Sequence, residues 1–144
     1  MKNATMGKVL VTARIENLHD LFNVSQGILK PDEVRSIEVT DALVDTGAST
    51  LCLPKRFVAQ LGLKHGQSRR ARTTAGTTRL QSYGVMRLTI QGRDWVGDVL
   101  EVPDDCPVLV GQLALEALDF VVDPMAQCLI GNPAHGGEQM VELY

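Results

Sequence analysis

The chain has 144 residues, of which 44% are hydrophobic and 22% are charged, and its formal net charge at pH 7 is −3. This length suits one domain, expected over residues 1–144, that buries roughly 70% of the surface of its unfolded chain. The small negative charge argues against a protein that neutralises nucleic-acid phosphates, and no apolar run approaches the roughly 18 residues of a membrane span. We therefore expect neither a nucleic acid nor a membrane among its partners.

The three cysteines, Cys52, Cys106 and Cys128, are odd in number and widely spaced. This favours reduced thiols and a cytoplasmic location over a disulfide framework. The first residues lack the uninterrupted apolar core of a signal peptide. No Cys-x-x-Cys or His-x-x-x-His spacing occurs, so we expect no metal site and no cofactor.

The first part of the chain is predicted to form two strands separated by turns. Residues 9–15 and 34–44 are rich in β-branched and apolar side chains, which is typical of strands. Turn-forming residues mark positions 25–27 and 30–32 between them.

A short buried strand at 51–53 leads into a predicted helix at 54–61. Proline suits the first turn of a helix, because the N–H that it lacks is not needed there. Phe57 and Leu61 share one face at a spacing of four residues, and Gly62 can end the helix in the left-handed conformation.

Three hairpins are predicted beyond this helix, each around a turn that contains glycine or proline. Their strands cover 69–74 with 77–90, 85–90 with 95–102, and 120–122 with 128–130. A second helix is expected at 112–118, a loop at 132–137 and a last strand at 140–144. Many short strands with one or two short helices indicate a mostly β fold, closed or partly closed into a barrel.

The most informative segment is 42–50, Ala-Leu-Val-Asp-Thr-Gly-Ala-Ser-Thr. It places Asp45 directly after an apolar strand end and directly before small residues, which presents one carboxylate on a tight loop at the floor of a cleft. A second signal, Leu109-Val110-Gly111, ends 64 residues after Gly47. A lone Asp-Thr-Gly occurs by chance in many proteins, and the flanking residues and the second motif at this distance make the signal specific.

Together the two motifs resemble those of the retroviral-type, or retropepsin-like, aspartic proteases, over about residues 34–122. The resemblance implies an acid-protease-like barrel with one lobe per chain and a catalytic role for Asp45. It implies that Thr46 holds the partner loop across a dimer axis. It also implies that Leu109, Val110 and Gly111 pack beneath the catalytic loop and lead into a helix.

A β-hairpin flap closes over substrate in this family, and its tip is expected here at Thr74, Ala75, Gly76 and Thr77. Gly76 can supply a positive φ, and small side chains let the tip approach a peptide backbone. An extended polypeptide substrate would then add as a strand between flap and floor.

Both ends of the chain depart from the viral pattern. Some 44 residues precede Asp45, with an extra segment at about 17–30, and residues 132–144 are also additional. These ends look closer to single-domain cellular or microbial relatives of the viral enzymes. The dimer sheet of the viral enzymes therefore does not carry over, and strands within 120–130 or 140–144 are the expected replacement.

The single Asp-Thr-Gly supplies half of a site that needs two carboxylates, so we expect a homodimeric aspartic endopeptidase. Two carboxylates about 3 Å apart repel by roughly 5 kcal/mol at an effective dielectric constant near 20, so the pair shares one proton. The ionised member takes a proton from water, and the neutral member donates to the carbonyl oxygen of the scissile bond.

The residues that follow Asp45 fit this chemistry. Gly47 lets two loops approach each other without a Cβ clash. A serine or threonine at position 48 would stabilise the charged carboxylate with its hydroxyl, but Ala48 has no hydroxyl to donate. We therefore expect a pH optimum that is mildly acidic.

Two other functions are compatible with parts of the pattern. The chain could be a protease-like module that binds peptides or dimerises without cleaving them. The segment 44–49 also looks like the first phosphate loop of actin-like and Hsp70-like ATPases, but those folds need further motifs on a much longer chain. Arg69, Arg70, Arg72 and Arg79 either select acidic residues near a cleavage site or form a solvated face.

Overall fold

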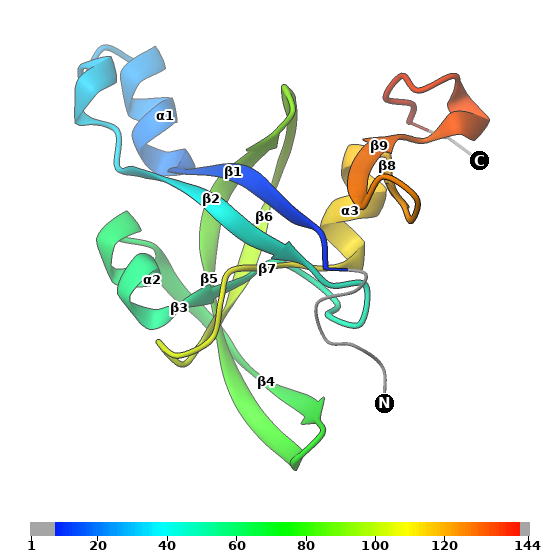
Figure 1. The fold of residues 1–144 in the computed structure, drawn as a ribbon. Coiled ribbons are helices and arrows are strands. Elements are labelled where there is room, and N and C mark those ends of the chain that lie inside the picture. The colour runs from blue at the N-terminus through cyan, green and yellow to red at the C-terminus, as the bar shows by residue number, and fades with distance from the viewer. Residues whose placement is uncertain (1–7, 142–144) are drawn as a thin grey trace.

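The computed structural model describes residues 8–141, and most of its regular structure is β (Figure 1). In chain order the elements are β1 (Leu10–Asn17), α1 (Leu18–Ser25), the 3-10 helix η1 (Pro31–Glu33), β2 (Ser36–Val44), β3 (Cys52–Pro54), α2 (Lys55–Leu61), β4 (Lys64–Thr73), β5 (Gly76–Ile90), β6 (Arg93–Val102), β7 (Leu109–Val110), α3 (Gln112–Leu118), β8 (Phe120–Asp123), β9 (Cys128–Gly131) and the 3-10 helix η2 (Pro133–His135).

Six strands close into a barrel, which confirms the predicted fold class. Their order is β1-β2-β7-β3-β6-β5, and β5 pairs back onto β1 to complete the ring. One edge of β5 is divided between two partners, because residues 76–84 pair with β4 and residues 86–89 pair with β1. The β4–β5 hairpin therefore begins in the barrel wall and projects from it (Figure 1).

The barrel interior holds one apolar cluster. Side chains that alternate along the strands meet there, and those with 0% or 1% exposure include Ala13, Ile15, Leu53, Met86, Leu88, Ile90, Val99 and Val110. Helix α2 adds Val58 and Leu61 to this cluster, and α3 adds Leu115 and Leu118. Within residues 8–141, no helix combines the length and apolarity that crossing a membrane requires.

The two predicted helices and the predicted hairpins form close to the expected residues. Helix α2 ends at Gly62, whose φ of +64° is the left-handed conformation expected there. Helix α3 covers the predicted residues. The β5–β6 turn is tighter than expected, since only Gln91 and Gly92 join the strands, both with positive φ. That pattern is a two-residue turn of the kind that matches the twist of a hairpin.

Helix α1 has no counterpart in the sequence analysis, which assigned only turns near it. The Asn17 side chain caps it by accepting a hydrogen bond from the Asp20 N–H (3.0 Å), and its Nδ2 donates to the Leu61 carbonyl (2.8 Å). Asp20 is buried and accepts three hydrogen bonds from Arg35, at 2.9, 2.8 and 3.0 Å. The additional segment is therefore joined to the barrel by an ion pair in which the Asp20 carboxylate is buried and the Arg35 side chain is half exposed.

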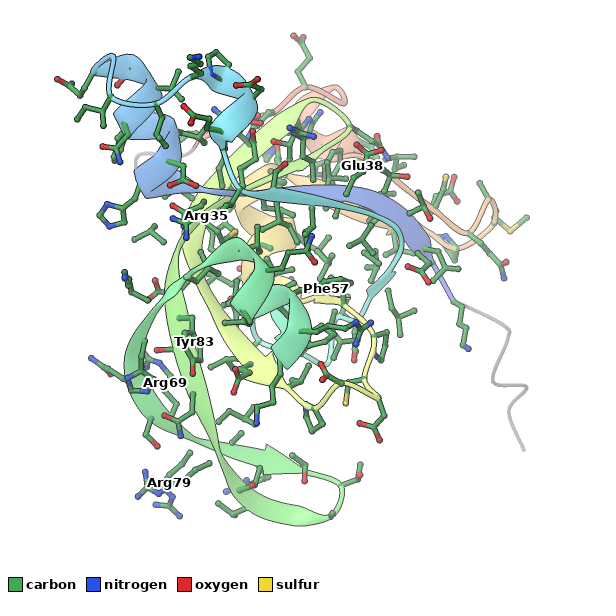
Figure 2. The ribbon with its side chains drawn as sticks, turned by 90° about the vertical axis from the view of Figure 1, so that its left-hand side faces the viewer. Arg35, Glu38, Phe57, Arg69, Arg79 and Tyr83 are labelled. Atoms are coloured by element: carbon green, nitrogen blue, oxygen red, sulfur yellow. The ribbon has the colours of Figure 1, made fainter. Side chains whose placement is uncertain are left out.

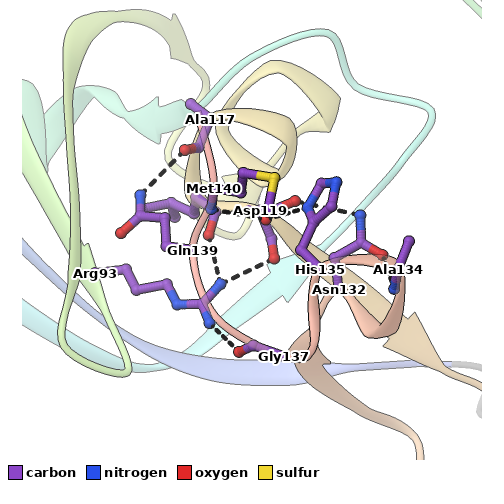
Figure 3. A network of polar contacts seen from close by, with 10 residues as sticks. Arg93, Ala117, Asp119, Asn132, Ala134, His135, Gly137, Gln139 and Met140 are labelled. Carbon is purple, nitrogen blue, oxygen red and sulfur yellow. Dashed lines mark hydrogen bonds and ion pairs between the residues drawn. The ribbon is translucent and has the colours of Figure 1, made fainter. Parts of the chain in front are cut away.

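The expected last strand at 140–144 is not formed by its described residues, and residues 142–144 lie outside the described part of the chain. The Met140 N–H donates instead to the Asp119 carboxylate (3.0 Å). Asp119 also accepts from His135 (2.6 Å) and Asn132 (3.2 Å), and these contacts hold its pKa below the ordinary value, His135 contributing most (Figure 3). This carboxylate draws residues 132–140 back over the end of α3, so Met140 does not join a sheet.

A close backbone approach fixes β7 and the start of α3 beneath the loop that follows β2. A Cβ atom on Gly111 would lie 2.6 Å from the Ala48 carbonyl oxygen and would overlap the Thr50 carbonyl oxygen as well. Both obstacles are backbone atoms, which cannot turn aside as a flexible side chain would. Only glycine fits at position 111 with the loop in this position.

Replacing Asp20 with asparagine should lower the free energy of unfolding at pH 7 by about 1.5–3 kcal/mol, the usual range for a hydrogen bond to a charged group. Arg35 holds the pKa of Asp20 below its ordinary value, mainly through the side-chain hydrogen bonds. The carboxylate thus contributes stability above about pH 4 that is lost as the pH falls through its lower folded-state pKa. Urea denaturation between pH 7 and pH 2.5 should show a shallower acid dependence in the variant.

The matched control is Asp32→Asn, which removes an exposed carboxylate that makes no contact with Arg35. It should leave both the stability and its acid dependence nearly unchanged. Equal behaviour of the two variants would show that the Asp20–Arg35 pair does not anchor α1.

Gly111→Ala should destabilise the fold by about 3 kcal/mol, the upper end of the range for forcing extra atoms into a packed site. Gly136→Ala is the control, because its Cβ would meet nothing within 4 Å and only the left-handed backbone, φ +68°, opposes it. That control should cost about 1 kcal/mol. If chemical denaturation finds Gly111→Ala no more costly than Gly136→Ala, the backbone approach is not a constraint.

Candidate active site

The Asp45 loop follows β2 directly and is held by backbone hydrogen bonds. The Asp45 N–H donates to the Val110 carbonyl (3.0 Å), and the Ala48 N–H donates to the Asp45 carbonyl (3.0 Å). One oxygen of the Asp45 carboxylate accepts from the Gly47 N–H at 2.9 Å. The carboxylate is half-buried at the end of an interior strand, in a position that the loop itself defines.

The second motif lies immediately beneath this loop. Leu43 and Val44 of β2 pair in parallel with Leu109 and Val110 of β7. Beyond Gly111, the first two N–H groups of α3 donate to the loop, Gln112 to the Ala48 carbonyl (2.8 Å) and Leu113 to the Ser49 carbonyl (3.0 Å).

A helix begins with N–H groups that have no partner inside the helix. In this chain the Asp45 loop supplies carbonyl partners for two of them. The loop and α3 therefore stabilise each other, and the structure brings together two segments more than 60 residues apart in sequence.

Thr46 and Gly47 form the exposed tip of the loop. Among residues 8–141, no side chain or backbone group forms a hydrogen bond with the Thr46 hydroxyl. A Cβ on Gly47 would lie 3.1 Å from the Asp45 carboxylate oxygen, so a larger residue there would crowd the acidic group. One protomer thus presents a single carboxylate beside an uncovered backbone surface.

A pocket of about 420 Å³ lies between the loop and the base of the β4–β5 hairpin. Its wall combines polar groups with an apolar floor and is made by Ser49, Thr50, Arg69, Ser82, Trp95, Gly97, Asp98, Val99, Leu100 and Leu113. Asp45 is not part of this wall. The pocket adjoins the same loop through Ser49 and Thr50.

The sequence analysis did not identify most of this wall. Trp95 packs against the apolar cluster, and its ring also covers Gly97 and faces the pocket. Residues 95, 97 and 99 share one face of β6 because strand side chains alternate. The alternation of side chains along the strand was the available signal. It does not show which residues line a pocket, because that depends on how the barrel closes.

The predicted flap tip lies at the end of the β4–β5 hairpin. Thr74 and Ala75 form the turn between Thr73 and Gly76, and Gly76 adopts a φ of +118°. The Thr73 hydroxyl donates to the Gly76 carbonyl (2.9 Å) and accepts from the Ala75 N–H (3.2 Å). Residues 72–79 are exposed, and Figure 2 shows this end of the hairpin projecting from the barrel.

Cys52 lies close to Asp45 but is not suited to chemistry. Burial, together with the neighbouring Asp45 charge and Cys106, raises the pKa of its thiol to about 11. A thiol with that pKa is protonated at neutral pH and is a poor nucleophile. Across residues 8–141, no group of three or more acidic, histidine or cysteine side chains is arranged to hold a metal ion.

The geometry agrees with a comparison against known families. Residues 36–117 match the model of the family described as gag-polyprotein putative aspartyl protease, and no match was found among curated proteins. The matched segment spans β2, both motifs and the hairpin between them, and it covers more than half of the chain. The chain therefore belongs to this retroviral-type aspartyl protease family.

Proposed function

We propose that the chain is an aspartic endopeptidase that acts as a homodimer, with Asp45 of each protomer forming the catalytic pair. The observation that carries this proposal is the Asp45 loop itself, which has its carboxylate in a defined position and its tip exposed. One protomer carries one such loop, and the proposed chemistry needs two carboxylates. A twofold axis through the loop tip would supply the other half.

The chemistry follows from placing the two carboxylates at hydrogen-bond distance. Their mutual repulsion leaves one proton shared by the pair over a broad pH range. The ionised Asp45 removes a proton from a bound water, whose oxygen attacks the scissile carbonyl carbon. The protonated Asp45 donates to the carbonyl oxygen, and collapse of the tetrahedral species releases the amine.

Features at the loop tip and on the C-terminal side support a dimer. The Thr46 hydroxyl is available to bond across the axis. Strands β8 and β9 form a separate two-stranded sheet, each with an unpaired edge, and Met125 at their turn is 92% exposed. Unpaired edges can pair with another chain, so we assign part of the interface to this sheet.

Substrate is proposed to bind as an extended polypeptide between the barrel and the β4–β5 hairpin. The pocket beside Ser49 and Thr50 takes one side chain, with Trp95 and Leu113 as its apolar surface. Closure of the hairpin over the peptide would exclude water and strengthen the electrostatic contribution of the carboxylate pair.

Asp45→Asn should reduce peptide cleavage by at least about 10²-fold, because it removes the general base and acid. The variant should still dimerise, and this allows a mixing experiment. A fourfold excess of Asp45→Asn over wild type should lower wild-type activity about fivefold, because random pairing leaves few dimers with two aspartates. Sedimentation would verify the dimer, and a fluorogenic peptide library would report cleavage.

Undiminished wild-type activity in the mixture would mean that one protomer is a complete enzyme, and the dimeric site would be wrong. A verified dimer that cleaves nothing between pH 3 and pH 8 would favour a protease-like peptide-binding module.

We also expect a mildly acidic pH optimum. Ala48→Thr adds a hydroxyl next to the carboxylate pair, which should stabilise the ionised form and move the acid limb of the pH–rate profile to lower pH. Ala48→Val is the control, because valine has the shape of threonine without the hydroxyl. The same shift in both variants would show that bulk, and not a hydrogen bond, sets the profile.

A further inference from the structure

The charge of the chain is unevenly distributed. Residues 64–90 contain six of the 14 basic residues and none of the 17 acidic ones, so the remaining chain has eight basic and 17 acidic residues and a net charge of −9. The β4–β5 hairpin is thus a cationic projection on an anionic body. Such a separation of charge favours a partner that is negatively charged over a short length.

The arginines of this hairpin occupy two different faces. Arg70 lies directly opposite Arg79 in the strand register, and Arg72 follows Arg70 by two residues, so these three side chains share one face. Arg69 is on the other face, opposite Leu80, and lines the pocket beside the catalytic loop. We call Arg70, Arg72 and Arg79 the arginine face; Figure 2 labels Arg69 and Arg79.

Outside the ribbon of residues 68–81, every arginine of the described chain has a polar partner. Arg14, Arg35, Arg56 and Arg87 form ion pairs with carboxylates, and Arg93 donates to three backbone carbonyls. With the partners available in residues 8–141, Arg79 is the one member of the arginine face with a polar contact, a 3.5 Å hydrogen bond to the Ser68 hydroxyl.

Like charges directly opposite each other destabilise a strand pair. Residues 68–73 and 76–81 pair only with each other, and an isolated two-stranded ribbon is at best marginally stable. The repulsion within the arginine face therefore lowers the stability of a ribbon that is only marginally stable. An anionic occupant would remove this cost.

The backbone indicates what kind of anion fits. β4 is the last strand of its sheet, so its outer edge carries unpaired N–H and C=O groups. A shallow hollow of about 330 Å³ lies on the ribbon next to this edge and is lined by Arg70, Ala71 and Arg72 of β4 and by Thr77 of β5. An extended peptide can bond to such an edge, with alternate side chains on one face.

We propose that the arginine face and the free edge of β4 form a docking site for an acidic, extended polypeptide segment, outside the Asp45 cleft. Glutamate or aspartate at every second position would point toward Arg70, Arg72 and Arg79, while the peptide backbone bonds to β4. The site holds its segment whether or not Asp45 cleaves, so it does not depend on the proposed catalysis.

A nucleic acid is a poorer occupant. It has no backbone N–H and C=O groups to pair with a strand edge, and residues 64–81 include no phenylalanine, tyrosine or tryptophan on which bases could stack. A long polyanion would also extend over the body of the protein, where the net charge is −9 and repels it.

The test measures binding of a fluorescent 12-residue Glu-Thr repeat peptide to the full chain by anisotropy at neutral pH and low salt. Arg70→Gln with Arg79→Gln should weaken binding about tenfold, since each exposed charge contact contributes modestly. The control is Lys30→Gln with Lys55→Gln, which changes the net charge equally at exposed positions outside the hairpin and should change binding less than about twofold.

A single-stranded oligonucleotide with the same number of charges is measured in parallel. Equal loss in the two double variants, tighter binding of the oligonucleotide, or no binding of the peptide by wild type would each overturn the proposal. A preserved thermal transition in each variant shows that the binding losses do not come from unfolding.

Arg79→Glu separates docking from hairpin structure. It places a carboxylate opposite Arg70, which should stabilise the ribbon and at the same time abolish binding of the acidic peptide. Improved hairpin protection in hydrogen exchange together with lost binding supports a docking role. Retained binding in Arg79→Glu would contradict it.

Discussion

The backbone contact between the Asp45 loop and the start of α3 is the constraint on which the candidate site depends. The loop supplies carbonyl partners to two N–H groups of α3, and Gly111 lets these backbones approach without an intervening side chain. Neither segment has this geometry alone. The position of the Asp45 carboxylate therefore depends on the pairing of β2 with β7 in the barrel.

Much of the fold could be predicted because its signals are local. Gly62 ends α2, two residues with positive φ close the β5–β6 turn, and α3 covers the predicted segment. The pairing of the Asp-Thr-Gly segment with residues 109–111 was expected through the family resemblance and not from either segment alone. Helix α1 and the path of residues 132–140 depend on distant partners.

Those partners are single side chains that no periodicity reveals. Asp20 meets Arg35, fifteen residues later, and the apolar pattern of 140–144 gives no sign that Asp119 will bind the Met140 N–H. The pocket wall was missed for a related reason. Alternation shows that residues 95, 97 and 99 share a face, but the wall also uses Asp98 and Leu100 from the other face, and the closure of the barrel places them beside Ser49. The position of the Asp45 loop was predictable from its motif, whereas the wall of the neighbouring pocket was not.

The division of one edge of β5 between β4 and β1 has a mechanical consequence. The 15 residues of β5 extend about 50 Å. The first part of the strand belongs to the projecting ribbon, and the last part belongs to the barrel wall. The partner on this edge changes from β4 to β1 at residues 84–86, where the pairing of β5 with β6 also has a register irregularity. We expect any tilt of the ribbon to be absorbed at this point, because residues 86–89 are held by β1 on one edge and by β6 on the other.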